Sequence, residues 1–216
     1  SLYNSLIPSV PDSAALYWKL ARLNICMAEA IPPKEREKRM PFYTKAVEYG
    51  QKAAQIDSSN ASAHTWLAAA LAVKADKIGS KAKLRRAAQI KHHLDKALEL
   101  NPNDDVAWSL LGSYNFEVSN IGWFSRFMGS TFVGQMPKGS REEAEKDFKK
   151  AISLNPRVIR HYHELAKLYL EEGRKKDALN LLLVAENKPV LMKSDIRRLH
   201  EIRKLIKKLK KEVGDN

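Results

Sequence analysis

The fold is decided by the stretch HYHELAKLYLEEGRKKDALNLLLVA, residues 161–185 of a chain of 216. The stretch contains two segments with the apolar spacing of amphipathic helices, separated at Gly173. Small residues recur where large ones would hold two helices apart, at Ala166, Ala178 and Ala185. The stretch therefore predicts two antiparallel helices that pack closely and turn at the glycine.

The order of large, small and turn positions resembles the tetratricopeptide repeat, a helix–turn–helix unit of about 34 residues. These positions are filled by Tyr162, Leu165, Ala166, Tyr169, Gly173, Ala178, Leu182 and Ala185. A single unit cannot bury its apolar face, so such units stack on one another. We therefore expect an all-α tetratricopeptide-repeat superhelix, a right-handed α-solenoid.

Three further units are indicated by a constant spacing along the chain, which we call the repeat interval. The same interval separates Leu6 from Ala21, Ala53 from Ala68, Ala97 from Gly112, and Ala151 from Ala166. Asn–Pro pairs at 101–102 and 155–156 stop a helix before the next unit. We expect one domain over residues 1–216, with repeats at 13–57, 61–100, 104–154 and 158–187. Residues 1–11 are expected to be the tail of an earlier, truncated repeat.

The first two units are longer than the last one. Ala21 is farther from Ala53 in the sequence, and Ala68 from Ala97, than Ala166 is from Ala185. The additional residues are rich in Lys, Arg, Ala and Glu, which favour helices. We therefore expect elongated helices, with turns at Pro32-Pro33 and at Gly79.

Segment 193–213 predicts a C-terminal capping helix, with Ser194 as its N-cap. Its apolar stripe consists of Ile196, Leu199, Ile202, Ile206, Leu209 and Val213. The alternative is a basic amphipathic helix that lies on a membrane surface or on a partner.

The third unit carries an insertion at 120–140 that is rich in apolar side chains, where a surface turn is expected. It contains Trp123, Phe124, Phe127, Met128, Phe132, Val133 and Met136. Two interpretations remain open: a flap packed into the core, or a lid over an apolar ligand or lipid chain. As a lid, it would place Arg126 and Lys138 at its edge, where they could hold an anionic headgroup.

The inner faces of the first helices supply further candidates for a ligand groove. These candidates are Trp18, Arg22, Trp66, Phe116, His163 and Lys167. Tetratricopeptide domains that clamp the terminal carboxylate of chaperones use Lys and Asn on these faces, whereas this chain has Thr65, Ala69 and Ser109. We therefore expect no such clamp. The small, partly apolar middle of the groove would suit an acyl chain or a helix.

Positive charge is concentrated in two segments of a chain whose formal net charge is +13. Residues 74–96 and 193–212 each carry a net charge of +6. The candidates for binding an anionic partner are Lys81, Lys83, Arg85, Arg86, Arg126, Arg203 and Lys207. Such segments are either solvated helix faces or surfaces for an acidic protein or a membrane. The sequence argues against nucleic acid, because no stacking aromatic side chains are interleaved with the basic residues.

No catalytic set of residues is visible in the sequence. The run His163-Glu-Leu-Ala-Lys167 begins like a zinc-binding helix but ends in Lys, so the second imidazole ligand is absent. One cysteine, Cys26, excludes an internal disulfide. No apolar run approaches the ~18 residues of a membrane span. We therefore expect a protein without enzymatic activity, cofactor or metal.

Three features together resemble the regulator of microtubule dynamics protein family over roughly residues 57–190. They are His64-Thr-Trp66, the stretch from Lys81 through Ile90-Lys91 and His93 to Asp104, and Trp123 to Arg126 followed by aromatic residues. The resemblance implies a tetratricopeptide fold with a lipid-holding cavity, because one member, a tether at contacts between endoplasmic reticulum and mitochondria, binds and transfers phospholipid. Other members are linked to microtubules and mitochondria.

Two functional hypotheses follow. In the first, a scaffold binds a partner helix, phospholipid or other apolar ligand in its groove under the insertion. In the second, basic helices bind acidic protein partners such as tubulin. A cytosolic or membrane-peripheral location is favoured, with any targeting segment outside the sequence; the oligomeric state is left open.

Overall fold

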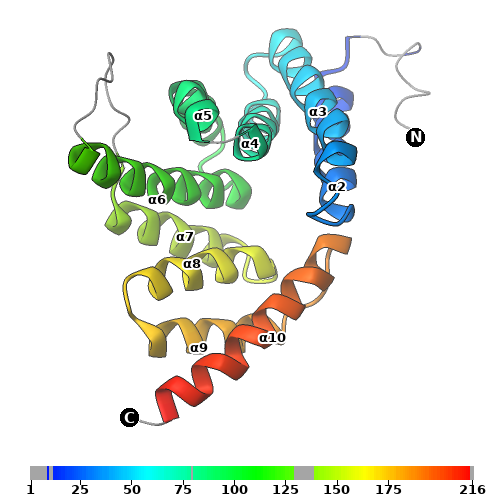
Figure 1. Cartoon of the computed structure of the whole chain (residues 1–216). Helices are drawn as coiled ribbons and strands as arrows, with labels where there is room; N and C mark the ends of the chain where they lie inside the picture. The colour runs from blue at the N-terminus through cyan, green and yellow to red at the C-terminus, as the bar shows by residue number, and fades with distance from the viewer. Residues whose placement is uncertain (1–8, 10–11, 79, 129–138, 215–216) are drawn as a thin grey trace. The chain divides into compact units, whose positions relative to one another are not determined.

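The chain forms successive helices in a computed structural model (Figure 1). The structure describes residues 9, 12–78, 80–128 and 139–214, and only the backbone at 76–78, 80–84 and 121–128. Within these residues the chain is helical without a strand, which confirms the predicted all-α class. The helices are α2 (Ala14–Ala30), α3 (Arg36–Ile56), α4 (Ala61–Ile78), α5 (Ser80–Leu100), α6 (Asp105–Met128), α7 (Arg141–Leu154), α8 (Ile159–Glu171), α9 (Lys175–Glu186) and α10 (Lys193–Gly214).

The elongation predicted for the first units is confirmed. Helices α2 to α5 have 17, 21, 18 and 21 residues, whereas α8 and α9 have 13 and 12. Because α2 ends at Ala30 and α3 begins at Arg36, Pro32 and Pro33 lie in the turn between them, as expected. Gly79, the other predicted turn residue, lies outside the described residues.

The predicted insertion at 120–140 begins as a continuation of α6 rather than as a turn. The backbone stays helical for 24 residues, as far as Met128. At the other end, the Ser140 hydroxyl accepts the backbone N–H of Glu143 and caps α7. Residues 129–138 lie outside the described residues, as do residues 1–8, 10 and 11 of the predicted repeat tail.

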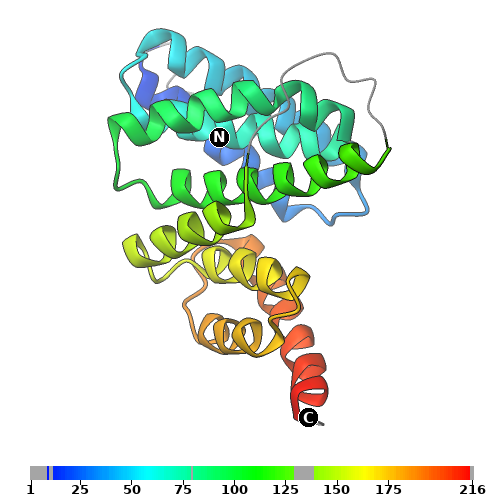
Figure 2. The ribbon, with the colours of Figure 1, turned by 90° about the vertical axis from the view of Figure 1, so that its left-hand side faces the viewer.

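Contacts divide the chain into two compact units, Ser1–Leu110 (unit 1) and Leu111–Asn216 (unit 2). In unit 1, α2, α3 and α4 pack against one another and α4 packs on α5; Figure 2 shows these helices stacked one behind another. At most 1% of the surface is exposed at each of the predicted small positions, Ala21, Ala53, Ala68 and Ala97. The repeat interval therefore marks the points where helices approach most closely.

Unit 2 depends on two glycines that the repeat pattern singled out. At the small position of α6, a Cβ atom added to Gly112 would lie 2.8 Å from a ring carbon of Phe148. Only a glycine therefore lets this ring of α7 lie against α6. Gly173 has a φ of +76°, and the N–H of Arg174 bonds back to the carbonyl of Tyr169, which closes α8.

Helix α10 caps unit 2 as predicted, because its apolar stripe packs against α8 and α9. Leu199, Ile202, Ile206 and Leu209 are buried. The prediction is wrong at Ile196, which is 62% exposed. Ile196 lies two helical turns before Arg203 and therefore on the exposed side of α10, where Arg203 pairs with Glu186 at the end of α9.

The predicted N-cap of α10, Ser194, is also wrong, because the helix already begins at Lys193. The carboxylate of Asp195 instead accepts the backbone N–H groups of Leu191 and Met192, each at 3.1 Å. This is the reverse half of a capping box, in which a side chain in the first turn reaches back to the residues before the helix.

One hydrogen bond recurs at the start of three repeats, and it was not predicted. A side chain four residues before the small position donates to a carbonyl in the loop preceding its helix. The donors are His64, Trp108 and Tyr162, and the acceptors are the carbonyls of Ser58, Pro102 and Pro156, at 2.9, 2.9 and 3.0 Å. The position therefore requires a large side chain with a polar tip.

Candidate interaction surfaces

Three of the predicted groove residues belong to unit 1, and the structure brings two of them together. The guanidinium of Arg22 on α2 lies 5.3 Å from the ring centre of Trp66 on α4, within cation–π range. Arg22 is exposed, and Trp66 and Trp18 are half-buried. This face of unit 1 therefore presents a cation and aromatic surface to solvent.

The predicted groove residues of unit 2 are mostly unavailable to a ligand. Phe116 is buried in the core, with the guanidinium of Arg141 5.8 Å from its ring centre. His163 is 8% exposed, and Arg198 of α10 lies near enough to act on its charge. Lys167 is exposed and forms an ion pair with Glu164 at 2.8 Å. The capping helix and α7 therefore cover positions that a repeat without them would leave open.

The aromatic insertion keeps its two interpretations. The side chains of Trp123, Phe124, Arg126, Phe127 and Met128, and the whole of Phe132, lie outside the described residues. The lid over an apolar or phospholipid ligand therefore stays a prediction.

The first basic segment, residues 74–96, lies mostly on α5. Arg85 is exposed there, and Arg86 is half-buried and donates to the Gln89 side chain at 3.3 Å. The side chains of Lys81 and Lys83 lie outside the described residues. The structure therefore shows two of the four candidates in this segment, and both are arginines near solvent.

The second basic segment forms an exposed face on α10, which we call the basic face. Its members are Arg203, Lys204, Lys207, Lys208, Lys210 and Lys211. Arg203 pairs with Glu186 at 3.1 Å, and Lys208 lies 3.7 Å from Glu212. In the described part of the chain, the other four cations have no carboxylate within ion-pair distance. Because Leu199, Ile202, Ile206 and Leu209 are buried, the part of α10 that carries the basic face offers its charge and not its apolar side to a partner.

A pair of histidines joins α4 to α5 in unit 1. The Nδ1 atoms of His64 and His93 lie 2.9 Å apart, and the Nε2 atom of His64 lies 2.9 Å from the carbonyl of Ser58. Because a carbonyl can only accept, His64 must carry a proton on Nε2, and as long as its ring is neutral His93 donates from Nδ1. Burial, with a smaller contribution from the charges of His64 and His92, lowers the pKa of His93 to about 4.

We expect unit 1 to lose stability in mild acid through His93. Folding lowers the pKa of His93 from 6.5 to about 4. The contribution of the neutral ring to the free energy of unfolding is therefore complete above pH 6.5 and is lost as the pH falls from 6.5 towards 4. Because the ring is half-exposed, we expect roughly 1–2 kcal/mol. Urea unfolding at pH 7 and pH 4.5 measures the difference. His93→Asn keeps a donor near Nδ1 but cannot titrate, and an equal acid loss in this variant would contradict the assignment.

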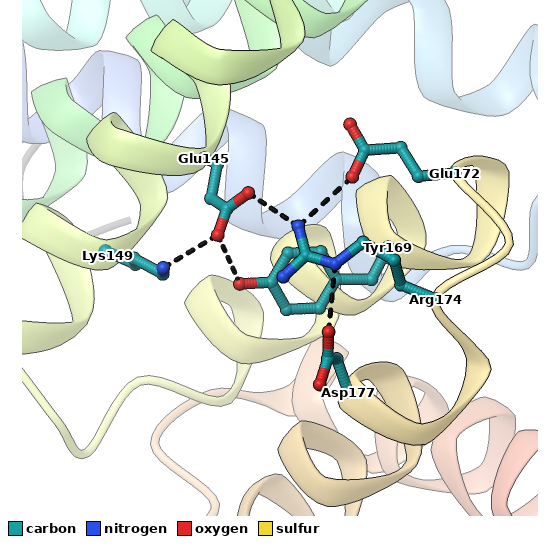
Figure 3. A network of polar contacts seen from close by, with 6 residues as sticks. All are labelled: Glu145, Lys149, Tyr169, Glu172, Arg174 and Asp177. Carbon is teal, nitrogen blue, oxygen red and sulfur yellow. Dashed lines mark hydrogen bonds and ion pairs between the residues drawn. The ribbon is translucent and has the colours of Figure 1, made fainter.

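A network of polar side chains joins α7, α8 and the turn before α9 (Figure 3). The carboxylate of Glu145 accepts from Tyr169 Oη, from Arg174 Nη1 and from Lys149 Nζ, each at 2.7 Å. Arg174 also bonds to Asp177 at 2.9 Å, and its guanidinium lies 3.7 Å from the ring centre of Tyr169. Burial alone would raise the pKa of Glu145, but the hydrogen bonds from Arg174, Lys149 and Tyr169 lower it to about 2. Each charged side chain of the network lies within ion-pair distance of a side chain of opposite charge. These contacts hold the turn between α8 and α9 in place.

The described residues offer neither a cluster of metal ligands nor a helix that could span a membrane. In this part of the chain, no group of three or more His, Cys, Asp or Glu residues is arranged to hold a metal ion. Over the same residues, no helix has both the length and the apolar character needed to cross a membrane.

Repeated helix pairs with buried small positions, a turn glycine and a capping helix define a tetratricopeptide-repeat protein. A solved structure with this fold is that of a thermophilic tetratricopeptide-repeat protein from Thermus thermophilus, with a TM-score of 0.64 and 17% sequence identity. The match covers 96% of this chain and 87% of that one. At this identity the likeness shows the fold alone.

The chain belongs to the regulator of microtubule dynamics protein 1–3 family, whose model matches residues 1–210. Regulator of microtubule dynamics protein 1 from Mus musculus is 31% identical over 196 residues, covering 90% of this chain and 64% of the relative. The protein of that name from Caenorhabditis elegans is 27% identical over 193 residues, covering 89% and 84%. The chain thus spans less than two thirds of the length of the mouse relative.

Proposed function

We propose that this chain is a non-enzymatic interaction scaffold that binds an acidic protein partner through the basic face of α10. The observation that carries the proposal is the uncompensated charge of Lys204, Lys207, Lys210 and Lys211. Cations that form no ion pair with the described carboxylates maintain a positive field that attracts an acidic segment and orients it along the helix. The spacing of Lys204, Lys207 and Lys211 places these three on one side of α10.

The rigidity of α10 supports the same role. Its buried stripe fixes the helix to α8 and α9, and Lys175 pairs with Glu212 at 2.8 Å near its end. The cations are thus presented on a helix that is already ordered, so binding has to order only their side chains. The relatives are named for microtubule dynamics, and the acidic tails of tubulin have the charge that this face would attract.

Cosedimentation with microtubules tests the proposal. The variant Lys204→Glu/Lys207→Glu/Lys211→Glu changes the charge of the basic face by six units and should weaken binding by about tenfold or more. Binding by the unchanged chain should also weaken when salt is raised, because exposed charges are screened.

The matched control is Lys34→Glu/Arg36→Glu/Lys45→Glu, which makes the same change of charge at exposed positions of unit 1. It should retain most of the binding. If both triple variants lose binding equally, net charge and not the basic face is responsible, and the proposal fails. It also fails if neither variant changes the bound fraction.

A further inference from the structure

Apolar side chains gather at the corner where α9 leads into α10. Val190, Leu191 and Met192 in the connecting loop and Ile196 in the first turns of α10 are 50%, 47%, 37% and 62% exposed. We call these four residues the apolar corner. Three of them are consecutive, whereas the other exposed large apolar side chains of the described residues, Met27 and Val184, lie singly on helices. Scattered apolar residues on a surface are ordinary, but a cluster of this kind marks a contact site.

Four backbone N–H groups in and before this loop are already bonded within the protein. The N–H groups of Asn187 and Lys188 bond to carbonyls of α9 at 3.3 and 3.1 Å, and Pro189 has no N–H. The N–H groups of Leu191 and Met192 are held by the buried carboxylate of Asp195. The loop therefore displays its apolar side chains without offering these backbone donors, which is the condition for entering a layer that contains little water.

Cations lie on both sides of the loop residues of the apolar corner. Lys188 precedes them and the exposed Lys193 follows them, and Asp195, the nearest acid in the first turn of α10, is buried and paired with Arg198 at 2.7 Å. Helical spacing also places Ile196 in line with the basic face, two turns before Arg203. A second copy of this chain placed on the same patch would bring cation against cation, which disfavours a symmetric dimer.

From this combination we propose that the apolar corner inserts into the interfacial layer of an anionic lipid bilayer, while the flanking cations and the basic face contact the headgroups. An apolar cluster bordered by cations is the combination that adsorbs to anionic membranes. Consecutive loop residues project in different directions, which suits a fluid layer, whereas a partner helix requires apolar contacts along one line. This membrane contact is distinct from the binding of an acidic protein, although both would use the basic face.

Flotation with vesicles of phosphatidylcholine containing about one third phosphatidylserine tests the proposal. We expect binding that is absent with phosphatidylcholine alone and that Leu191→Gln/Ile196→Gln reduces by about tenfold or more. This variant removes apolar surface without changing charge. The control, Met27→Gln/Val184→Gln, removes two equally exposed apolar side chains elsewhere and should bind as the unchanged chain does.

A fluorescent probe measures insertion independently of affinity. Met192→Cys in a Cys26→Ser background provides a single labelling site in the loop. A probe there that is sensitive to polarity should shift to the blue on vesicle binding and be quenched by spin-labelled lipid. Binding without any shift or quenching would mean that charge alone attracts the chain, and this result would overturn the proposal.

The remaining outcomes separate this inference from the proposed function. Leu191→Gln/Ile196→Gln should leave microtubule binding unchanged, whether or not Lys204→Glu/Lys207→Glu/Lys211→Glu weakens it. If it reduces microtubule binding but not vesicle binding, the apolar corner belongs to a protein interface. If sedimentation velocity shows a dimer that this variant dissociates, the corner is a contact between copies. Either result would overturn the membrane assignment.

Discussion

Replacing Phe148 with alanine should destabilise unit 2 by about 3–5 kcal/mol, the range for removing a fully buried aromatic ring. The ring is 0% exposed and lies in the core formed by α6, α7 and α8. Its neighbour on α6 is Gly112, which has no side chain that could move into the cavity. We therefore expect a value near the upper end of the range, measured by urea unfolding and by hydrogen exchange of the amides in residues 111–216.

A double-mutant cycle with Gly112→Ala tests the reason for this effect. With Phe148 present, the new methyl group would meet the ring at 2.8 Å, and its cost should outweigh the roughly 1 kcal/mol by which alanine favours a helix over glycine. With Phe148→Ala, the same methyl group enters the cavity and should stabilise unit 2. The sign of the Gly112→Ala effect should therefore reverse, and additive effects would contradict the close contact.

Replacing Arg39 with methionine should cost unit 1 about 2–4 kcal/mol, because it leaves partly buried groups without their cation. Arg39 is 2% exposed, although it is charged. Its Nε donates to the carbonyl of Ala28 at 2.9 Å, and its Nη2 pairs with Glu29 at 2.5 Å. Arg39 lies on α3 and provides a hydrogen-bond donor to a carbonyl in the last turn of α2. Methionine can replace only the apolar contacts of the arginine side chain.

Two comparisons isolate the contribution of this buried pair. Lys38→Met removes the neighbouring cation, which forms an exposed ion pair with Glu35, and should change the free energy of unfolding by at most about 1 kcal/mol. Adding Glu29→Met to Arg39→Met should recover part of the loss, because the Glu29 carboxylate keeps the hydrogen bond from Tyr43 but loses its pairing with the Arg39 guanidinium in the single variant. Equal losses for Lys38→Met and Arg39→Met would show that burial of the pair has no effect.

Local sequence was sufficient for the helix pairs and for their turns. The repeat interval located the small positions, and each of Ala21, Ala53, Ala68 and Ala97 is buried. Gly173 was predictable because the required backbone conformation belongs to a single residue. These features depend on helix periodicity and on neighbours a few residues away, which the sequence displays directly.

The candidate site was less predictable, because it depends on which helix covers which face. Phe116 and His163 occupy positions that a repeat turns inward, but α7 and α10 bury them. Ile196 was counted with the apolar stripe of α10 and is nevertheless exposed, because helical spacing places it in line with the exposed Arg203 and not with the buried Leu199 and Ile202. The histidine pair and the network around Glu145 join residues that are far apart in the sequence, and no local pattern announces such contacts.

The sequence by itself determined the repeat class, the family, the elongated helices and the concentration of charge in the C-terminal segment. Only the tertiary structure decided that α10 turns its apolar stripe inward and its cations outward, and that an apolar corner is displayed beside them. The physical reason is that periodicity and composition are properties of one segment, whereas exposure is a property of the neighbours that pack against it.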